Sequence, residues 1–279
     1  DLARHVETAL DLDEVWSYIN PQMLFGKHLG FKGRFSDAVE AGDEKALELL
    51  AIVDKVKDEL RADDGMHARA VWQFFEVEPD GNNLHLFGAD DRSAPIASFT
   101  FPRQRKDDGL ALPDLALPPE RDGEGRVVKR DHIAMFVTTA GDGIRARAEK
   151  AKDAGEYVRS YAMQALALES AEAAAELIHA RIRELWGFPD DPNARRKDLF
   201  QAHYRGKRYS FGYPACPELA DQATLFRLLQ PEEIGVELTE GFMMDPEASV
   251  SALVFHHPDA IYFAAGESAI ESPSGAAPA

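Results

Sequence analysis

Apolar residues follow two different spacings along the chain, and short runs rich in aromatic and β-branched residues predict strands. The runs ARAVWQFFEVE and LHLFG, separated by the turn residues of 79–82, predict a β-hairpin, and SAPIASFTFP predicts a further strand. HIAMFVTTAG is apolar almost throughout, as in a buried central strand. Near the end, VELTEGFMM, SVSALVFHH and AIYFAA predict three more strands.

Apolar residues spaced three and four apart predict helices elsewhere. A short acidic helix is expected near the start, and Pro21 should end it. Residues 37–60 form an amphipathic pattern that Ser36 can cap. The Ala- and Glu-rich segment at about 144–186 is strongly helical, and it predicts two helices or one helix bent at Gly155. Gly187 should end this segment.

Strands before and after a long helical block predict an α+β fold with a central, largely antiparallel sheet. Residues 1–266 are expected to form one domain, in which 103–125 make an irregular excursion over the surface. The tail 267–279 is small, polar and proline-bearing, so we expect it to be disordered.

Charge and cysteine content restrict the classes of partner and the redox environment that we expect for this protein. The formal net charge of −18 argues against nucleic acid as a partner, because phosphate binding needs a basic face. No apolar run approaches the ~18 residues of a membrane span, so no membrane partner is expected. The single cysteine, Cys216, excludes a disulfide scaffold and favours a reducing, cytoplasmic setting. Residues 195–208 form a basic island, which either contacts an anion or acidic partner or is a solvated segment.

Three motifs have more than one interpretation. TTAGDG at 138–143 is either a plain strand-to-helix turn or a cradle for a phosphate or nucleoside, and the incomplete glycine pattern favours the plain turn. Glu172, Glu176 and His179 share a helix face, as a polar stripe facing solvent or a ligand cleft. Metal binding there would need a second Glu-x-x-His pair, so we predict no metal site. Cys216 precedes a proline, and structural packing is favoured over a nucleophilic role.

The segment 205–217 is the most informative candidate site. Its prolines and glycine fix a rigid, irregular backbone that exposes main-chain groups in set directions. Arg208 can present a planar pair of donors to a carboxylate, which lysine cannot do. A buried structural loop is the other interpretation.

Three segments of this sequence, RGKRYSFGYPACPELADQ, LTEGFMMDPEASVSALVFHHPDAIYF and KRDHIAMFVTTAG, together resemble the activation, or reactivation, domain of cobalamin-dependent methionine synthase. The resemblance extends with interruptions from about residue 12 to residue 263. It implies a single C-shaped domain that binds S-adenosylmethionine in a shallow groove. The domain would present the sulfonium methyl group for reductive methylation of cobalamin, after a flavodoxin-like or other reductase supplies an electron. It would thus act as the methyltransferase component of methionine synthesis.

The resemblance also assigns residues. Arg208 matches the arginine that holds the ligand, and Tyr213 matches the tyrosine that approaches the corrin, so Tyr213 is the candidate catalytic residue. Glu172 matches an acid lining the cleft. The other expected ligand contacts are Asn20, Gly212, Ala215, Tyr262 and Phe263.

Two departures from the family pattern affect function. Asn20 stands where the family usually has aspartate, which weakens the expected contact with the ligand's ammonium group. The cobalt-ligating Asp-x-His-x-x-Gly motif is absent, so cobalamin is expected on a partner module. The chain would be an excised domain or a stand-alone subunit, not competent for full turnover alone. The alternatives are a docking module of the same fold without ligand binding and a conventional Rossmann methyltransferase, which the broken glycine motif disfavours.

Overall fold

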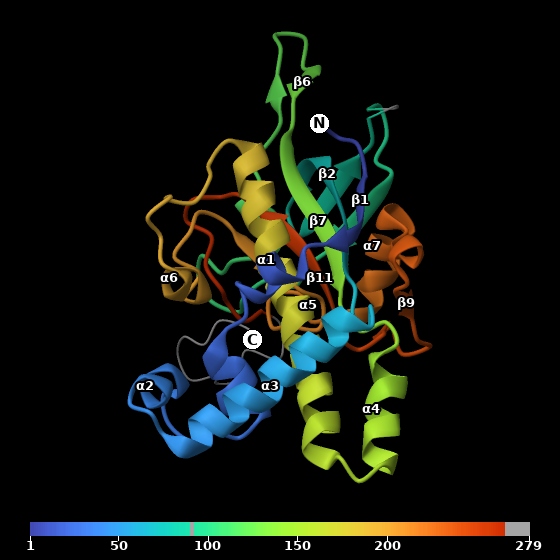
Figure 1. Ribbon diagram of the computed structural model, residues 1–279. Helices are drawn as coiled ribbons and strands as arrows, with labels where there is room; N and C mark the ends of the chain where they lie inside the picture. The colour runs from blue at the N-terminus through green and yellow to red at the C-terminus, as the bar shows by residue number, and fades with distance from the viewer. Residues whose placement is uncertain (90–91, 266–279) are drawn as a thin grey trace.

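A twisted antiparallel sheet organises the protein in the computed structural model, which describes residues 1–89 and 92–265 (Figure 1). The long strand β2 lies near its centre, and β1 and β3 pair with different halves of the same edge of β2. The strands run in the order β4, β3, β2, β7, β11, β8, with β1 beside β2. Their bounds are β1 His5–Leu10, β2 Ala68–Asp80, β3 Asn83–Phe87, β4 Ala97–Thr100, β7 Asp131–Thr139, β8 Lys207–Tyr209 and β11 Ser249–Phe255.

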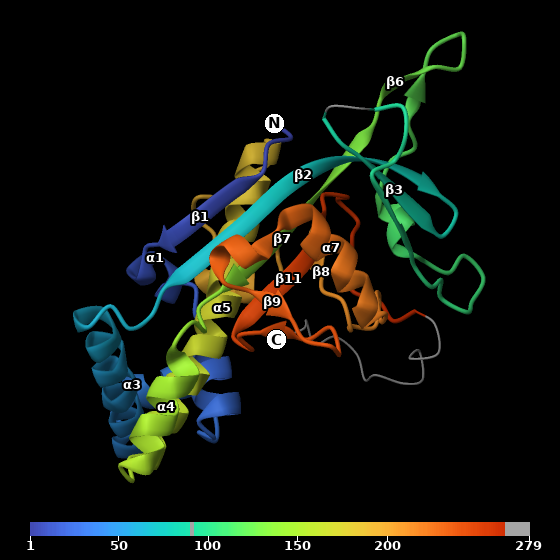
Figure 2. The same ribbon diagram turned by 90° about the vertical axis from the view of Figure 1, so that its right-hand side faces the viewer.

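Both faces of the sheet are covered. Side chains along β7 alternate, so Phe136 enters the core on one face while Met135 and Val137 enter the core on the other. Figure 2 shows α1, α3 and α5 on one side of the sheet and α7 on the opposite side. The prediction of a buried central strand and of an α+β fold with an antiparallel sheet is therefore confirmed.

The helical block after β7 consists of two antiparallel helices. Helix α4 spans Ile144–Asp153 and α5 spans Tyr157–Trp186. Gly155 lies between them at φ +81°, and Gly187 ends α5 at φ +94°, both in the left-handed region that glycine adopts without strain. Alanines on the buried face of α5 let the helix lie close to β2, β7 and β11. The predicted interruption at Gly155 is confirmed.

Shorter elements complete the fold. Those before β7 are α1 Leu12–Trp16, the π-helix η1 Gln22–His28, α2 Phe35–Glu40, α3 Glu44–Ala62, η2 Leu112–Leu115, β5 Glu120–Arg121 and β6 Val127–Lys129. Those after α5 are α6 Arg196–Phe200, η3 Leu219–Asp221, α7 Gln222–Leu229, η4 Pro231–Ile234, β9 Glu237–Leu238 and β10 Met244–Asp245. The surface excursion at 103–125 is mostly irregular and ends in the projecting β5–β6 hairpin (Figure 1). Within the described ranges, no helix has the length and apolar character needed to cross a bilayer.

Four local predictions need correction. The chain begins with strand β1, because pairing with β2 outweighs its weak helical pattern; the short acidic helix is present only as α1, which ends at Trp16, and Pro21 starts η1. The run VELTEGFMM is not one strand but the short antiparallel pair β9 and β10. The pattern at 37–60 is split into α2 and α3, since Gly42 turns the chain and Asp43, not Ser36, caps α3 through a 2.9 Å bond from the Ala46 N–H. The run AIYFAA is irregular, and its apolar side chains instead pack against the core. The predicted disordered tail lies outside the described residues.

Candidate functional site

Arg208 lies on the edge strand β8, where its backbone pairs with Val254 of β11. Its side chain points to α5 and is 12% exposed. Nη1 donates to Glu176 Oε1 at 2.6 Å, and Nη2 lies 3.8 Å from Glu172 Oε2. Burial alone would lower the pKa of Arg208, but the nearby negative charge, above all that of Glu176, holds it well above its usual range. The guanidinium is therefore a fixed, largely buried cation between α5 and the sheet.

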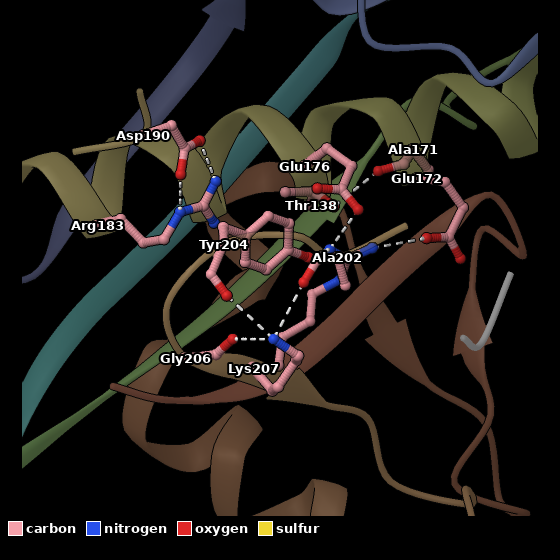
Figure 3. Close-up of polar contacts among 11 residues, drawn as sticks. Thr138, Ala171, Glu172, Glu176, Arg183, Asp190, Ala202, Tyr204, Gly206 and Lys207 are labelled. Carbon is pink, nitrogen blue, oxygen red and sulfur yellow. Dashed lines mark hydrogen bonds and ion pairs between the residues drawn. The ribbon is translucent and has the colours of Figure 1, made fainter. Parts of the chain in front are cut away.

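Glu172 and Glu176 are one helical turn apart on α5, and Figure 3 shows both pointing away from the helix toward the segment before β8. Glu176 is 15% exposed and Glu172 is 31% exposed. Burial raises the pKa of Glu172 to about 7, with Arg208 opposing that shift and Glu176 adding to it. Glu172, with its pKa of about 7, is also the more exposed of the two carboxylates and remains open to an incoming group.

Tyr213 occupies the tip of the predicted rigid loop. Gly212, at φ +85°, allows a tight turn in which the Gly212 N–H donates to Cys216 O and the Cys216 N–H donates to Tyr213 O, both at 2.9 Å. The Tyr213 side chain is 42% exposed, and the pKa of its phenol is raised by burial and by the charge of Glu172. Ala215 is buried beneath the loop. The charges of Glu172 and Arg208 thus act on Tyr213, whose ring is accessible from outside.

Cys216 lies beneath the same loop, and its thiol donates to Ser210 O at 2.8 Å. Burial raises the pKa of this thiol to about 12, so it stays protonated at neutral pH. Both observations agree with the structural role favoured from the sequence.

Tyr262 and Phe263 are half-buried and lie against Tyr209, with ring centroids 5.7 and 6.2 Å from that of Tyr209. The Tyr209 hydroxyl donates to Ile261 O at 2.7 Å and so fixes the segment that carries them. Burial raises the pKa of the Tyr262 phenol, and the charge of Arg208 opposes that shift. Tyr262 therefore belongs to the Arg208 cluster, whereas Phe263 reaches it only through Tyr209.

Asn20 is not brought into this cluster. Its Oδ1 accepts the Gln22 N–H at 3.0 Å and so helps begin η1. Among the described residues it has no hydrogen bond to Arg208, Glu172 or Tyr213. The link between η1 and α5 is made instead by His28 Nε2 and Glu169 Oε1, 3.0 Å apart, where burial lowers the pKa of His28 and raises that of Glu169 to about 7.

Much of the basic island serves the fold. The ammonium group of Lys207 donates to main-chain carbonyls, and the guanidinium of Arg205 lies 4.5 Å from the centroid of the Phe188 ring. Arg196 covers the ring of Tyr18, and Arg195 pairs with Asp198 at 3.0 Å. Residues 195–197 are exposed, so they are accessible to the anionic partner considered for the basic island. Lys207 and Arg205 are instead engaged in the contacts within the protein described above.

The TTAGDG turn lines a separate cleft of about 370 Å³. Gly141 is needed there for packing, since a Cβ would lie 2.7 Å from Pro246 Cβ. The charges at the rim are largely paired, with Asp142 bound to Arg69 and Arg145 bound to Asp245 at 2.7 Å. These contacts favour the plain strand-to-helix turn.

Sequence reasoning missed Tyr204, which contacts Arg208 Nη1 through its hydroxyl at 3.4 Å. It also left the partner of Glu176 unassigned. The sequence feature that could have indicated Tyr204 is its position four residues before Arg208. It lies in the basic island at 195–208, which was interpreted by its charge alone.

Comparison with known proteins gives one consistent family. Residues 11–272 match the family described as vitamin B12 dependent methionine synthase, activation domain. Methionine synthase of Mycobacterium tuberculosis (strain ATCC 25618 / H37Rv) is 33% identical over 261 residues, which cover 90% of this chain and 21% of that protein. Methionine synthase of Mycobacterium leprae (strain TN) is 33% identical over 205 residues, covering 71% and 17%. The chain thus spans about a fifth of the length of these relatives.

A solved structure, that of the MetH reactivation domain bound to AdoHcy, superposes with a TM-score of 0.84 at 29% identity. The superposition covers 94% of this chain and 81% of that one. Because both the sequence match and the fold extend over nearly the whole chain, this protein belongs to the family of activation domains of vitamin B12 dependent methionine synthase.

Proposed function

We propose that this chain binds S-adenosylmethionine between α5 and β8, at the Arg208–Glu172 pair, and presents its methyl group for reductive methylation of cobalamin. The observation that supports the proposal is this pair, with Arg208 Nη2 3.8 Å from Glu172 Oε2 and with both charges acting on the pKa of Tyr213. The AdoHcy bound to the related reactivation domain supports the ligand class.

Each group of the ligand would meet a chemically suitable side chain. Among the described residues, Nε of Arg208 has no hydrogen bond and Nη2 has only the 3.8 Å ion pair with Glu172, so a ligand carboxylate can bind this edge through a planar pair of donors. The carboxylate of Glu172 suits a cationic ammonium or sulfonium group. Tyr204 and Tyr262 provide aromatic surface beside Arg208, while Gly212 and Ala215 shape the loop beneath Tyr213. In this proposal Asn20 and Phe263 contribute at the margin.

In the proposed reaction the chain holds the methyl donor in position and does not transfer a proton. The leaving group is a neutral thioether, so no general acid or base is needed, and holding the donor in line with its acceptor is the main contribution. Cobalamin, carried by a separate module, would supply the nucleophile after one-electron reduction by a flavodoxin-like or other reductase. Tyr213, accessible at the tip of its loop, is our candidate for the contact with the corrin face. A cytoplasmic location belongs to this proposal and agrees with the buried free thiol of Cys216.

Calorimetric titration of the chain with S-adenosylmethionine tests the binding step, with adenosine as the control for non-specific uptake. The methylation step is tested by mixing the chain with a cobalamin-loaded partner module, a reductant and S-adenosylmethionine. Methylcobalamin should form faster with the chain than without it. Tyr213→Ala should slow this step more than it weakens ligand binding, and equal rates with and without the chain would refute the catalytic role.

A docking module without ligand binding is the second candidate. One observation favours it, namely that Asn20 replaces a carboxylate and directs its Oδ1 into a capping bond within η1. On this alternative the chain would bind the cobalamin-carrying module but give no heat of binding with S-adenosylmethionine.

A further inference from the structure

The ring of Tyr204 is fixed by buried groups that have no part in the proposed chemistry. The guanidinium carbon of Arg183 lies 3.9 Å from the Tyr204 ring centroid, and Arg183 Nε donates to Asp190 Oδ1 at 2.7 Å. Arg183 Nη1 has no hydrogen-bond partner among the described residues, and the guanidinium instead makes a cation–π contact with the face of the Tyr204 ring. His179, fully buried on the same helix, meets the ring edge-on at 5.0 Å between centroids.

The main chain around Tyr204 is equally constrained. Lys207 Nζ donates to the carbonyls of Ala202, Tyr204 and Gly206 at 3.1, 3.1 and 2.9 Å, as Figure 3 shows, so all three of its protons hold this turn together. Gly206 has φ +76°, and a Cβ at this position would lie 2.4 Å from Phe255 O. Only glycine fits against the end of β11, which fixes the height of the turn above the sheet.

These contacts aim the Tyr204 hydroxyl at the candidate ligand site. The hydroxyl oxygen accepts from Arg208 Nη1 at 3.4 Å. Arg208 Nη1 is thereby held between Glu176 and Tyr204, which leaves the opposite edge of the guanidinium, Nε and Nη2, without a hydrogen bond among the described residues.

We propose that Tyr204 is a positioning residue that orients Arg208, so that the Nε–Nη2 edge of the guanidinium meets the carboxylate of the ligand. The inference rests on the proposed binding of S-adenosylmethionine and adds a specificity role. Tyr204 raises affinity only for ligands that carry the amino-acid carboxylate. Without this contact Nη1 keeps only its bond to Glu176, so the guanidinium is freer to rotate about its last side-chain bonds, and part of the binding energy is then used to restrict that rotation.

The test compares two ligands and two tyrosines. The change Tyr204→Phe removes one oxygen and keeps the ring contacts with Arg183 and His179. Its dissociation constant for S-adenosylmethionine should rise about 2- to 12-fold, the range for loss of one hydrogen bond. Its dissociation constant for decarboxylated S-adenosylmethionine, which keeps the sulfonium, ammonium and adenosine groups, should be unchanged. The matched control Tyr161→Phe, on an exposed part of α5, should affect neither ligand.

A double-mutant cycle keeps the test independent of any loss of stability. With Arg208→Lys in place there is no guanidinium to orient, so adding Tyr204→Phe should change the affinity for S-adenosylmethionine by less than about 2-fold. Equal weakening of both ligands, no weakening of either, or an undiminished effect in the Arg208→Lys background would overturn the positioning role. A wild-type chain that binds neither ligand would refute the proposed function itself, a result distinct from the other three.

Discussion

Replacing Arg208 by alanine is the most direct test of the candidate site. The change removes the side chain that we expect to bind the ligand carboxylate through two charge-assisted hydrogen bonds. Loss of such a contact reduces the binding free energy by about 1.5–3 kcal/mol, so the dissociation constant for S-adenosylmethionine should rise roughly 10- to 150-fold. The upper part of the range applies if the ligand carboxylate is as little exposed as Arg208, whose side chain is 12% exposed.

The same substitution should also destabilise the fold. Glu176, which is 15% exposed, would lose the donor 2.6 Å away, and Glu172 would lose its nearest cation. A partly buried carboxylate left without its partner costs about 1–3 kcal/mol of unfolding free energy. A fall in affinity could then arise from a disordered site rather than from a missing contact.

The double variant Arg208→Ala/Glu176→Gln separates these two causes, because the amide needs no counter-charge. Thermal unfolding followed by circular dichroism should show recovery of most of the lost stability, while calorimetry should show affinity still reduced to the level of the single variant. Recovery of affinity along with stability, or an unchanged dissociation constant in a folded Arg208→Ala chain, would refute the assignment of Arg208 to the ligand.

Three further predictions concern charge. Because the deprotonated form of Glu172, with a pKa of about 7, would attract a cationic ligand, affinity should increase as pH rises from 5.5 to 7, and Glu172→Gln should flatten the profile in calorimetric titrations; equal slopes would exclude the contact. Asn20→Asp should tighten binding by less than ~2 kcal/mol while keeping the cap on Gln22, and weaker binding at neutral pH would mean that position 20 does not face the ammonium group. Charge reversal of exposed Arg195 and Arg196 should slow association with an anionic partner measured by stopped flow, without changing ligand affinity; a salt-independent wild-type rate would argue against steering.

The elements predicted correctly from sequence are those whose pattern has a local cause. The run at 131–139 is apolar on both faces, because both faces of β7 are covered. Gly155 adopts a left-handed conformation that only a break between helices requires. The hairpin of β2 and β3 turns at Gly81, as the turn residues indicate. In each case the residues of the element itself carry the signal.

Two of the elements predicted wrongly depend on contacts distant in sequence. Strand β1 exists because His5 and its neighbours pair with Trp72 and the residues around it, a partner that no local pattern reveals. The apolar run at 260–265 looks like a strand but packs as irregular chain, fixed through the Tyr209 hydroxyl. Tyr204 escaped notice for the same reason, since its role depends on Arg183 from a different element. The resemblance to a known family named Arg208 and Tyr213 but not the residues that hold them.

The two elements that carry the candidate site, α5 and β8, differ in how firmly they are packed, and this difference bears on how the site moves. Helix α5 has 30 residues and packs on three strands, whereas β8, which carries Arg208, pairs only three residues with β11 at the edge of the sheet. Amide hydrogens of α5 near Glu172 should therefore exchange with solvent only through large-scale unfolding, and those of β8 through brief local opening. Local opening of β8 would then govern entry and exit of a ligand. Helix α5 would stay in place and keep the carboxylates of Glu172 and Glu176 at a fixed spacing.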